Sequence, residues 1–327
     1  MDEFRNYDQL FPELVYDILH YFWINNRVKK PNEKSVLNYC ETSRFNTELP
    51  KGDIIQPDVV NLICQKMVKN GVLVKTGNGL GMPDLTSNYL YVPKDNTLFD
   101  TMDPSILFRF NCMAYGFRYI YGAYRQYVMP IIVRKKGKIT MGTCFKFRNG
   151  ILTAKHCVEA DEVAIPGYTS EKLQKCKVVV SEDEKLDMAY IETNEPSVLL
   201  PSEAKVLDEV LVMGYPKIPQ FFDFCAAERA AISSIPTRGA VASLSGQFIN
   251  YRVGELMLVT ARIRGGNSGG PIISTEGAVV GVAFCEPMSE GDYDEMGYGI
   301  AYPIAVFNQM LQYATFLNVN FVDNIES

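Results

Sequence analysis

Hydrophobic residues recur at helical spacing through the first part of the chain. Between residues 10 and 23, apolar side chains return every three or four positions, which predicts an amphipathic helix. Residues 35–40 predict a short second helix, and the segment 57–71 predicts a third that begins at a proline and ends at a glycine. Two short apolar runs, 72–75 and 89–92, flank a glycine-rich turn and predict a β-hairpin.

The order of these elements within residues 1–95 resembles a winged helix-turn-helix module, in pattern only. A helix then follows, because Asp103-Pro104 is a typical helix start and apolar and aromatic residues recur at helical spacing from Ile106 to Tyr124. An aromatic stripe can mark a ligand site, but a helix packed between two domains is the commoner reason for one. We therefore interpret residues 96–127 as a connecting helix.

The pattern changes after Met129-Pro130. Short apolar or alternating runs now appear, separated by turn residues, which is typical of an all-β sandwich or a pair of barrels. Helical spacing returns between residues 304 and 316, and residues 319–327 remain as a C-terminal tail. We expect a multidomain chain, with a mostly α module followed by an all-β domain over residues 128–318 that ends in a helix.

Composition limits the partners and the compartment. The 327 residues include 38 acidic and 32 basic side chains, a net charge of −6 that argues against general binding of polyanions. No apolar run reaches membrane-spanning length, and residues 1–6 are acidic and polar, which predicts neither a membrane span nor a secretory signal. The eight cysteines are scattered, as expected of reduced thiols in a cytoplasmic protein. Secretion after removal of a leader remains an alternative.

Histidine is scarce, which restricts the possible chemistry. The chain has two histidines, His20 and His156, and no Cys-x-x-Cys pair, so we expect neither a metal site nor a cofactor. His20 lies on a predicted helix one turn after Asp17, a position that favours a structural role. A mechanism that needs a proton acceptor at neutral pH is left with His156.

The run Arg264-Gly265-Gly266-Asn267-Ser268-Gly269-Gly270-Pro271 is the most informative stretch. Its glycines allow a tight turn whose backbone N–H groups converge on one point, as an oxyanion hole requires. A serine at the apex can attack a carbonyl carbon if a neighbouring base removes its proton. A glycine-rich turn with a serine is common in proteins of many functions, so the prediction of catalysis depends on the other two groups.

His156 follows a short strand and supplies the base, and an imidazole needs a carboxylate to fix its tautomer. Asp187 opens an apolar strand and is the preferred candidate. Asp161 and Asp183 are alternatives in polar stretches, where a solvated surface role is usual.

Together these segments, in the order His, Asp, Ser, resemble the chymotrypsin-like (trypsin-like) serine proteases, and most of all their HtrA/Deg branch. The shared features are Gly-Asn-Ser-Gly-Gly-Pro at the serine, Leu-Thr before the histidine, Gly214-Tyr215-Pro216, and the segments 239–243 and 299–303. The resemblance implies a double β-barrel and a serine endopeptidase that works through an acyl-enzyme. Asn267 stands where trypsin-type enzymes have an aspartate that pairs with a new N-terminus, so we do not expect activation by that route.

The resemblance also assigns residues around the serine. Gly266, Asn267 and Ser268 form the oxyanion hole, with N–H donors from Gly266 and Ser268. The predicted substrate-binding residues are Arg262, Ile263, Val282, Ala283, Phe284, Cys285 and Gly299. Ile263 favours a small or medium apolar side chain before the cut, whereas an inward Arg262 would favour an acidic one; we favour the apolar preference.

Two cysteines stand near the predicted histidine loop. Cys144 and Cys157 occupy positions where extracellular relatives can carry a disulfide, so the resemblance implies that they lie close together. In a reducing compartment we do not expect a covalent bond between them.

The leading hypothesis is a serine endopeptidase that residues 1–95 regulate or target, with a protein or peptide as substrate. The rival is a nucleic-acid-binding regulator whose protease domain cuts only its own chain. Residues 1–95 hold 11 basic and 12 acidic side chains, which disfavours phosphate binding, although Lys66, Lys69 and Lys75 cluster near the third helix and the hairpin. An inactive peptide-binding scaffold is disfavoured because all three catalytic side chains are present.

Overall fold

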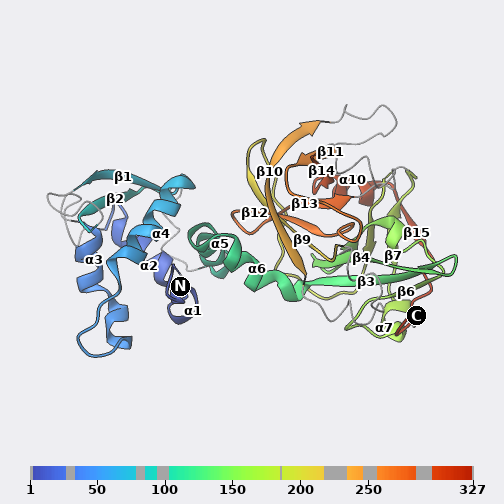
Figure 1. Ribbon diagram of the computed structural model, residues 1–327, viewed down its shortest axis with the longest axis horizontal. Coiled ribbons are helices and arrows are strands. Elements are labelled where there is room, and N and C mark those ends of the chain that lie inside the picture. Colours follow the sequence, from blue (N-terminus) through green and yellow to red (C-terminus); the bar gives the residue numbers. More distant parts are fainter. Residues whose placement is uncertain are drawn as a thin grey trace. The chain divides into compact units, whose positions relative to one another are not determined.

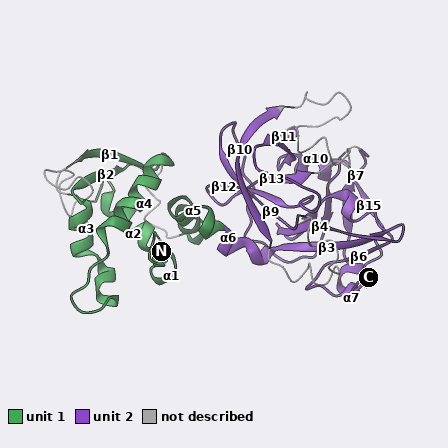
Figure 2. Ribbon diagram, viewed as in Figure 1, with its two compact units in different colours: residues 1–120 green, residues 121–327 purple. Residues whose placement is uncertain are grey.

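The computed structural model describes residues 3–26, 34–78, 85–93, 103–184, 186–216, 234–245, 256–284 and 297–325. The chain divides into two compact units, residues 1–120 and 121–327 (Figure 2). The boundaries predicted from the sequence were 1–95, 96–127, 128–318 and 319–327.

The first unit is mostly helical, with one hairpin (Figure 1). Its elements are α1 (Tyr7–Leu10), α2 (Leu14–Phe22), α3 (Val36–Thr42), the 3₁₀ helix η2 (Arg44–Glu48), α4 (Pro57–Lys69), β1 (Leu73–Asn78), β2 (Ser87–Tyr91) and α5 (Pro104–Tyr115). β1 and β2 are antiparallel, as predicted. The order of helices before a hairpin also agrees with the sequence; membership of the winged-helix class stays a prediction.

Two helices differ from the sequence prediction. The helix expected over residues 10–23 is interrupted, since α1 ends at Leu10 and α2 begins at Leu14. Pro12 lies in the gap, and a proline there disfavours helical backbone at the residue before it. The expected connecting helix is likewise two helices, α5 and α6 (Phe117–Tyr124), because Gly116 adopts a left-handed φ of 74° and ends α5.

The first unit has its own hydrophobic core. Leu14 and Ile18 of α2, Ile63 of α4, and Phe110 and Tyr115 of α5 are all buried in one cluster. Helix α5 therefore packs into the first unit and is part of its core, which a free connecting helix would not be.

The described strands of the second unit form two β-sheets (Figure 1). One has the strand order β15-β7-β8-β5-β4-β3-β6, and the other closes into a barrel of order β10-β11-β14-β13-β12-β9. The strands of the first are β3 (Val128–Lys135), β4 (Lys138–Phe147), β5 (Gly150–Thr153), β6 (Glu162–Ala164), β7 (Val178–Ser181), β8 (Ala189–Ile191) and β15 (Ala314–Leu317). Those of the second are β9 (Glu209–Gly214), β10 (Ile235–Ser245), β11 (Leu256–Val259), β12 (Pro271–Ser274), β13 (Val279–Phe284) and β14 (Gly299–Pro303).

Short elements accompany these sheets in the described part of the second unit. They are the 3₁₀ helices η4 (Arg125–Tyr127) and η5 (Lys155–Cys157), and the helices α7 (Ser170–Gln174) and α10 (Val306–Gln312). The all-β architecture with a helix near its C-terminal end agrees with the sequence prediction. Continuous apolar segments of the sequence form strands in which every residue is buried, as in β5 and β13.

The C-terminal residues are part of the first sheet, whereas the sequence predicted a tail. β15 pairs with β7, and the next residues continue to the opposite edge strand, β6. There the N–H of Val163 donates to the carbonyl of Asn320 at 3.0 Å, and the N–H of Val322 donates to the carbonyl of Val163 at 2.9 Å. Phe321 is buried in the sheet's core and Ile325 in a smaller adjoining cluster. This segment thus joins the two edges of the sheet.

Replacement of Phe321 by alanine should lower the free energy of unfolding by about 3–5 kcal/mol, because it removes a buried ring and leaves a cavity. The matched control is Phe316→Ala in β15, where the ring is 66% exposed; we expect a change within about 0.5 kcal/mol. Urea denaturation of both variants measures the difference. Equal midpoints for the two would show that the C-terminal segment does not stabilise the sheet.

Candidate active site

Strand pairing brings His156 and Asp187 together. His156 lies on η5, just after β5, and Asp187 lies just before β8. The two strands are antiparallel neighbours, with Thr153 opposite Ala189. The end of one strand therefore lies beside the start of the other, and the loops that carry the two side chains meet.

Asp187 holds His156 with two hydrogen bonds. Its Oδ2 is 2.6 Å from Nδ1 of the imidazole, and its Oδ1 accepts the backbone N–H of His156 at 2.8 Å. Of the three aspartates considered from the sequence, the structure places Asp187 at the histidine; Asp161 instead accepts the N–H of Lys136. A carboxylate at Nδ1 favours the tautomer with its proton there, which leaves Nε2 as a proton acceptor.

The surroundings of His156 also change its basicity. Burial lowers the pKa of the imidazole, but Cys157 and the Asp187 carboxylate raise it, and the net effect is a pKa above the ordinary 6.5. The imidazolium that forms when the base accepts a proton is therefore stabilised. Asp187 is itself fixed, because its backbone N–H donates to the Tyr302 hydroxyl at 3.4 Å.

Ser268 lies in the loop between β11 and β12. Gly266 and Gly269 have φ angles of 99° and 84°, in the left-handed region that favours glycine. Within the loop, the N–H of Asn267 donates to the carbonyl of Arg264 at 2.9 Å. The N–H groups of Gly266 and Ser268 donate to no residue that the structure describes. They are the two donors that the sequence assigned to an oxyanion.

The serine and histidine loops meet over β4. The N–H of Thr143 donates to the carbonyl of Ser268 at 2.9 Å. A methyl group added at Gly142 would lie 2.5 Å from the sulfur of Cys157 and 3.4 Å from the carbonyl oxygen of Ser268. Ser268 and the residue that follows His156 therefore pack on the same glycine. Among the described contacts, no hydrogen bond joins the Ser268 hydroxyl to the imidazole.

The two thiols near this loop are free. Cys144 and Cys157 are both buried in the core cluster of the first sheet, in agreement with the expected proximity. Burial raises the pKa of the Cys144 thiol, which favours its neutral form.

The predicted pocket residues have contrasting environments. Arg262 is exposed, and its carbonyl accepts the hydroxyl of Thr237 at 2.9 Å. Ile263 is buried, and a methyl group at Gly299 would lie 2.7 Å from its Cγ1. Ile263 and Gly299 thus lie together, with the guanidinium of Arg262 on the surface side.

The strand predicted to pair with substrate also fastens the serine loop. The N–H of Ala283 donates to the carbonyl of Gly270, and its carbonyl accepts the N–H of Gly269, both at 2.8 Å. Because both backbone groups of Ala283 are occupied, Ala283 itself cannot pair with an extended peptide, and Phe284 pairs with Ile300 of β14. Val282 pairs with Pro271 and Tyr302 on the neighbouring strands. Cys285 lies outside the described residues.

Three residues at the site were not singled out from the sequence: Thr143, Thr153 and Tyr302. Tyr302 belongs to the segment 299–303 that carried part of the family resemblance, so that motif could have indicated it. Thr143 and Thr153 are fully buried in strands. Thr153 belongs to the Leu-Thr segment that carried part of the resemblance, whereas nothing in the sequence distinguishes Thr143 from an ordinary core threonine.

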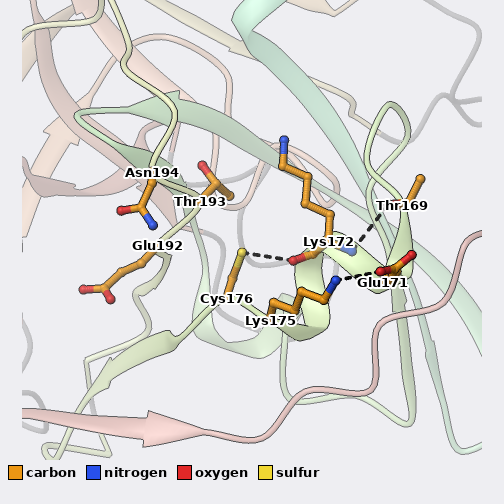
Figure 3. Close-up of a pocket in the computed structure, with 8 residues that line it drawn as sticks. All are labelled: Thr169, Glu171, Lys172, Lys175, Cys176, Glu192, Thr193 and Asn194. Carbon is orange, nitrogen blue, oxygen red and sulfur yellow. Dashed lines mark hydrogen bonds and ion pairs between the residues drawn. The ribbon is translucent and has the colours of Figure 1, made fainter.

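A surface pocket of about 370 Å³ lies at the other end of β8 from Asp187. It is lined by Thr169, Glu171, Lys172, Lys175, Cys176, Glu192, Thr193 and Asn194 (Figure 3). Lys175 pairs with Glu171 at 2.6 Å, and Lys172 pairs with Glu195. Each lysine thus has a carboxylate partner, although Glu195 is shared with Lys146. The hydroxyl of Thr193 is buried without a partner among the described residues.

Two further properties hold for the described part of the chain. No helix there is long and apolar enough to cross a membrane. No group of three or more His, Cys, Asp or Glu side chains is arranged there to hold a metal ion.

Comparison with known proteins agrees with the location of this site. Residues 141–282 match the family model of the trypsin-like peptidase domain, a range that contains His156, Asp187 and Ser268. No curated protein matches the chain.

Several solved structures are similar over part of the chain. The Rv3671c protease of M. tuberculosis in its active form is 20% identical, with a TM-score of 0.46, over 64% of this chain and 89% of that one. The HtrA-type protease AlgW with a tripeptide is 19% identical, with a TM-score of 0.45, over 59% of this chain and 61% of that one. The serine endoprotease from Yersinia pestis is 21% identical, with a TM-score of 0.41, over 59% of this chain and 64% of that one.

Proposed function

We propose that this chain, which carries a trypsin-like peptidase domain over residues 141–282, is an endopeptidase that cuts peptide bonds through Ser268, His156 and Asp187. The observation that carries the proposal is the double hydrogen bond between Asp187 and His156. It orients the imidazole and leaves Nε2 to remove the proton of the Ser268 hydroxyl.

The reaction then follows from the positions of these groups. The deprotonated Ser268 oxygen attacks the carbonyl carbon of the substrate, and the N–H groups of Gly266 and Ser268 stabilise the oxyanion. The imidazolium of His156 gives its proton to the leaving amine as the acyl-enzyme forms, and a water molecule then releases the acyl group by the same route. Asp187 stabilises the positive charge on His156 while the tetrahedral intermediate exists.

A fluorophosphonate probe tests the identity of the nucleophile, because it labels a serine that a neighbouring base has activated. We expect one adduct on the wild-type chain, located at Ser268 by mass spectrometry. Ser268→Ala should abolish it, and Ser274→Ala, in the next strand of the same barrel, should label as the wild type does. An adduct elsewhere, or no adduct, would reject the proposed function.

The pocket favours a small or medium apolar side chain before the cut. Ile263 is buried against Gly299, whereas Arg262 is exposed. An acidic substrate side chain in this pocket would need a cationic partner there, and neither Ile263 nor Gly299 supplies one. A cleavage profile on a denatured proteome measures this preference directly.

We further propose that the first unit binds protein and regulates or targets the peptidase, in a cytoplasmic setting that the scattered cysteines favour. Leu10, Ile24, Val74 and Val92 expose apolar side chains on this unit. Lys66, a candidate phosphate ligand under the rival hypothesis, lies 4.0 Å from the carboxylate of Glu3. These features favour a protein partner over a nucleic acid.

The salt dependence of DNA binding tests this choice. For the full chain carrying Ser268→Ala, which cannot cut itself, we expect no sub-micromolar affinity for duplex DNA and almost no change between about 50 and 200 mM salt. Tight binding that weakens steeply with salt would favour the nucleic-acid-binding regulator instead.

Regulation is tested separately by peptidase rates. A chain that starts at Gly116 keeps α6, whose Tyr121 and Tyr124 hydroxyls bond to the carbonyls of Ser234 and Gly277. We expect its kcat/KM to differ from that of the full chain by about fivefold or more. Equal values would show that the first unit does not control the peptidase.

A further inference from the structure

Thr143 ties the serine loop to the first sheet. Its side chain is fully buried in β4, and its hydroxyl donates to the carbonyl of Gly266 at 2.6 Å and accepts the N–H of Tyr215 at 3.0 Å. Its backbone N–H donates to the carbonyl of Ser268 at 2.9 Å. Its carbonyl accepts the hydroxyl of Thr153, at the end of the strand before the histidine, at 2.8 Å. One residue therefore contacts both predicted loops of the active site.

These bonds fix the orientation of one peptide group. The Tyr215 N–H can only donate, so the single proton of the Thr143 hydroxyl is directed to the carbonyl of Gly266. At the other end of the same peptide, the N–H of Asn267 donates to the carbonyl of Arg264. The Gly266–Asn267 peptide is thus held at both ends. In this orientation the N–H groups on either side of it, those of Gly266 and Ser268, remain available.

Packing leaves little alternative support for this peptide. A methyl group at Gly214 would lie 2.7 Å from Oδ1 of Asn267 and 2.9 Å from the hydroxyl oxygen of Thr143. The side chains of Thr143 and Asn267 therefore both pack against the backbone of Gly214, where a larger residue would not fit. Oδ1 of Asn267 is buried and has no hydrogen-bond partner among the described residues. The Asn267 carboxamide oxygen packs against Gly214 without a hydrogen bond to a described residue, and Thr143 supplies the directional contact.

We propose that Thr143 is a positioning residue for the oxyanion hole, which holds the Gly266–Asn267 peptide so that the N–H groups of Gly266 and Ser268 face the developing negative charge. The inference rests on the proposed peptidase function. If the Thr143 hydroxyl is lost, the Gly266 carbonyl has no buried donor, and glycine at that position permits the peptide to rotate. Because the oxyanion forms only after attack, the loss affects kcat much more than KM.

The test is the isosteric substitution Thr143→Val. We expect kcat to fall about 10- to 100-fold with KM within about threefold. Thr143→Ser keeps the hydroxyl and should restore kcat to within about threefold of the wild type. Affinity for a peptidyl boronic acid, whose tetrahedral adduct occupies the oxyanion hole, should fall with Thr143→Val by the same factor as kcat/KM.

The matched control is Thr193→Val. Thr193 is 8% exposed, lines the pocket at the other end of β8 (Figure 3), and its hydroxyl has no partner in the described part of the chain. The same atoms are removed there without the loss of a hydrogen bond, so kcat should stay within about twofold. If Thr143→Val does not fold, Thr153→Val takes its place, because it removes the bond to the Thr143 carbonyl and should lower kcat in the same direction.

The outcomes separate the two proposals. A wild-type chain that takes no fluorophosphonate label rejects the peptidase function, and this inference with it. A wild-type chain that labels at Ser268, together with a folded Thr143→Val variant of unchanged kcat and unchanged boronic acid affinity, rejects the role of Thr143 alone. If Thr143→Ser does not restore kcat, the proposed role of Thr143 is also rejected, since its hydroxyl would then not be the group that positions the oxyanion hole.

Discussion

Replacement of Ser268 by alanine is expected to lower kcat by about four orders of magnitude or more, because it removes the nucleophile and leaves only binding and the oxyanion donors. His156→Ala should cost a similar factor, since the serine hydroxyl then has no base. The groups act as a unit, so the double variant should be little slower than either single one.

Steady-state kinetics on a peptide substrate measures these rates, with circular dichroism to show that the variants fold. Ser274→Ala is the control for a serine in the same barrel and should keep the wild-type kcat. A His156→Ala chain that retained most of its activity would exclude the mechanism. Because this chain has one other histidine, His20, on a helix of the first unit, no second imidazole in the second unit could compensate.

Asp187→Asn is expected to lower kcat by roughly 10³- to 10⁴-fold while the fold is kept. The carboxamide can donate a hydrogen bond to Nδ1, which places the imidazole proton on Nε2 and leaves no acceptor for the serine proton. The control is Asp183→Asn, an aspartate that the structure does not place at the imidazole, and it should leave kcat unchanged. If Asp183→Asn caused the loss and Asp187→Asn did not, the acid would be wrongly assigned.

The same variant should also shift the pH dependence. The pKa of His156 is raised, so the imidazole is protonated and inactive as a base below that pKa, and kcat/KM rises as the pH increases through it. This rising limb should lie above pH 6.5 in the wild type. Asp187→Asn removes the negative charge, so the limb of its residual activity should move to lower pH. A limb at the same pH in both proteins would show that Asp187 does not set the pKa.

The candidate catalytic side chains could be predicted from the sequence because each stands in a characteristic local sequence pattern. The turn around Ser268 needs glycines at left-handed φ angles, and those glycines are visible in the sequence. Asp187 was preferred because an apolar strand follows it, and the pairing of that strand with β5 is what places it at His156. Short local patterns thus predicted a contact between distant residues.

Contacts that depend on the register of long-range strand pairs could not be predicted in this way. Thr143 has the sequence context of any core threonine, and its role depends on where β4 meets the serine loop. Gly116 divides the expected connecting helix through its backbone conformation, while the helical spacing of apolar residues continues on both sides of it. Phe321 lies in a segment that is too short for the spacing of its apolar residues to predict a helix or a strand.

The path of the C-terminal segment has a consequence for biosynthesis. Asn320 donates a hydrogen bond to the carbonyl of Asp161, 159 positions earlier in the chain, and Phe321 enters the core beneath the strands that carry the histidine loop. Contacts between such distant positions slow folding, and a growing chain cannot make them until residues 320 and 321 have left the ribosome. The sheet that supports His156 and Asp187 is therefore completed only after Phe321 has left the ribosome.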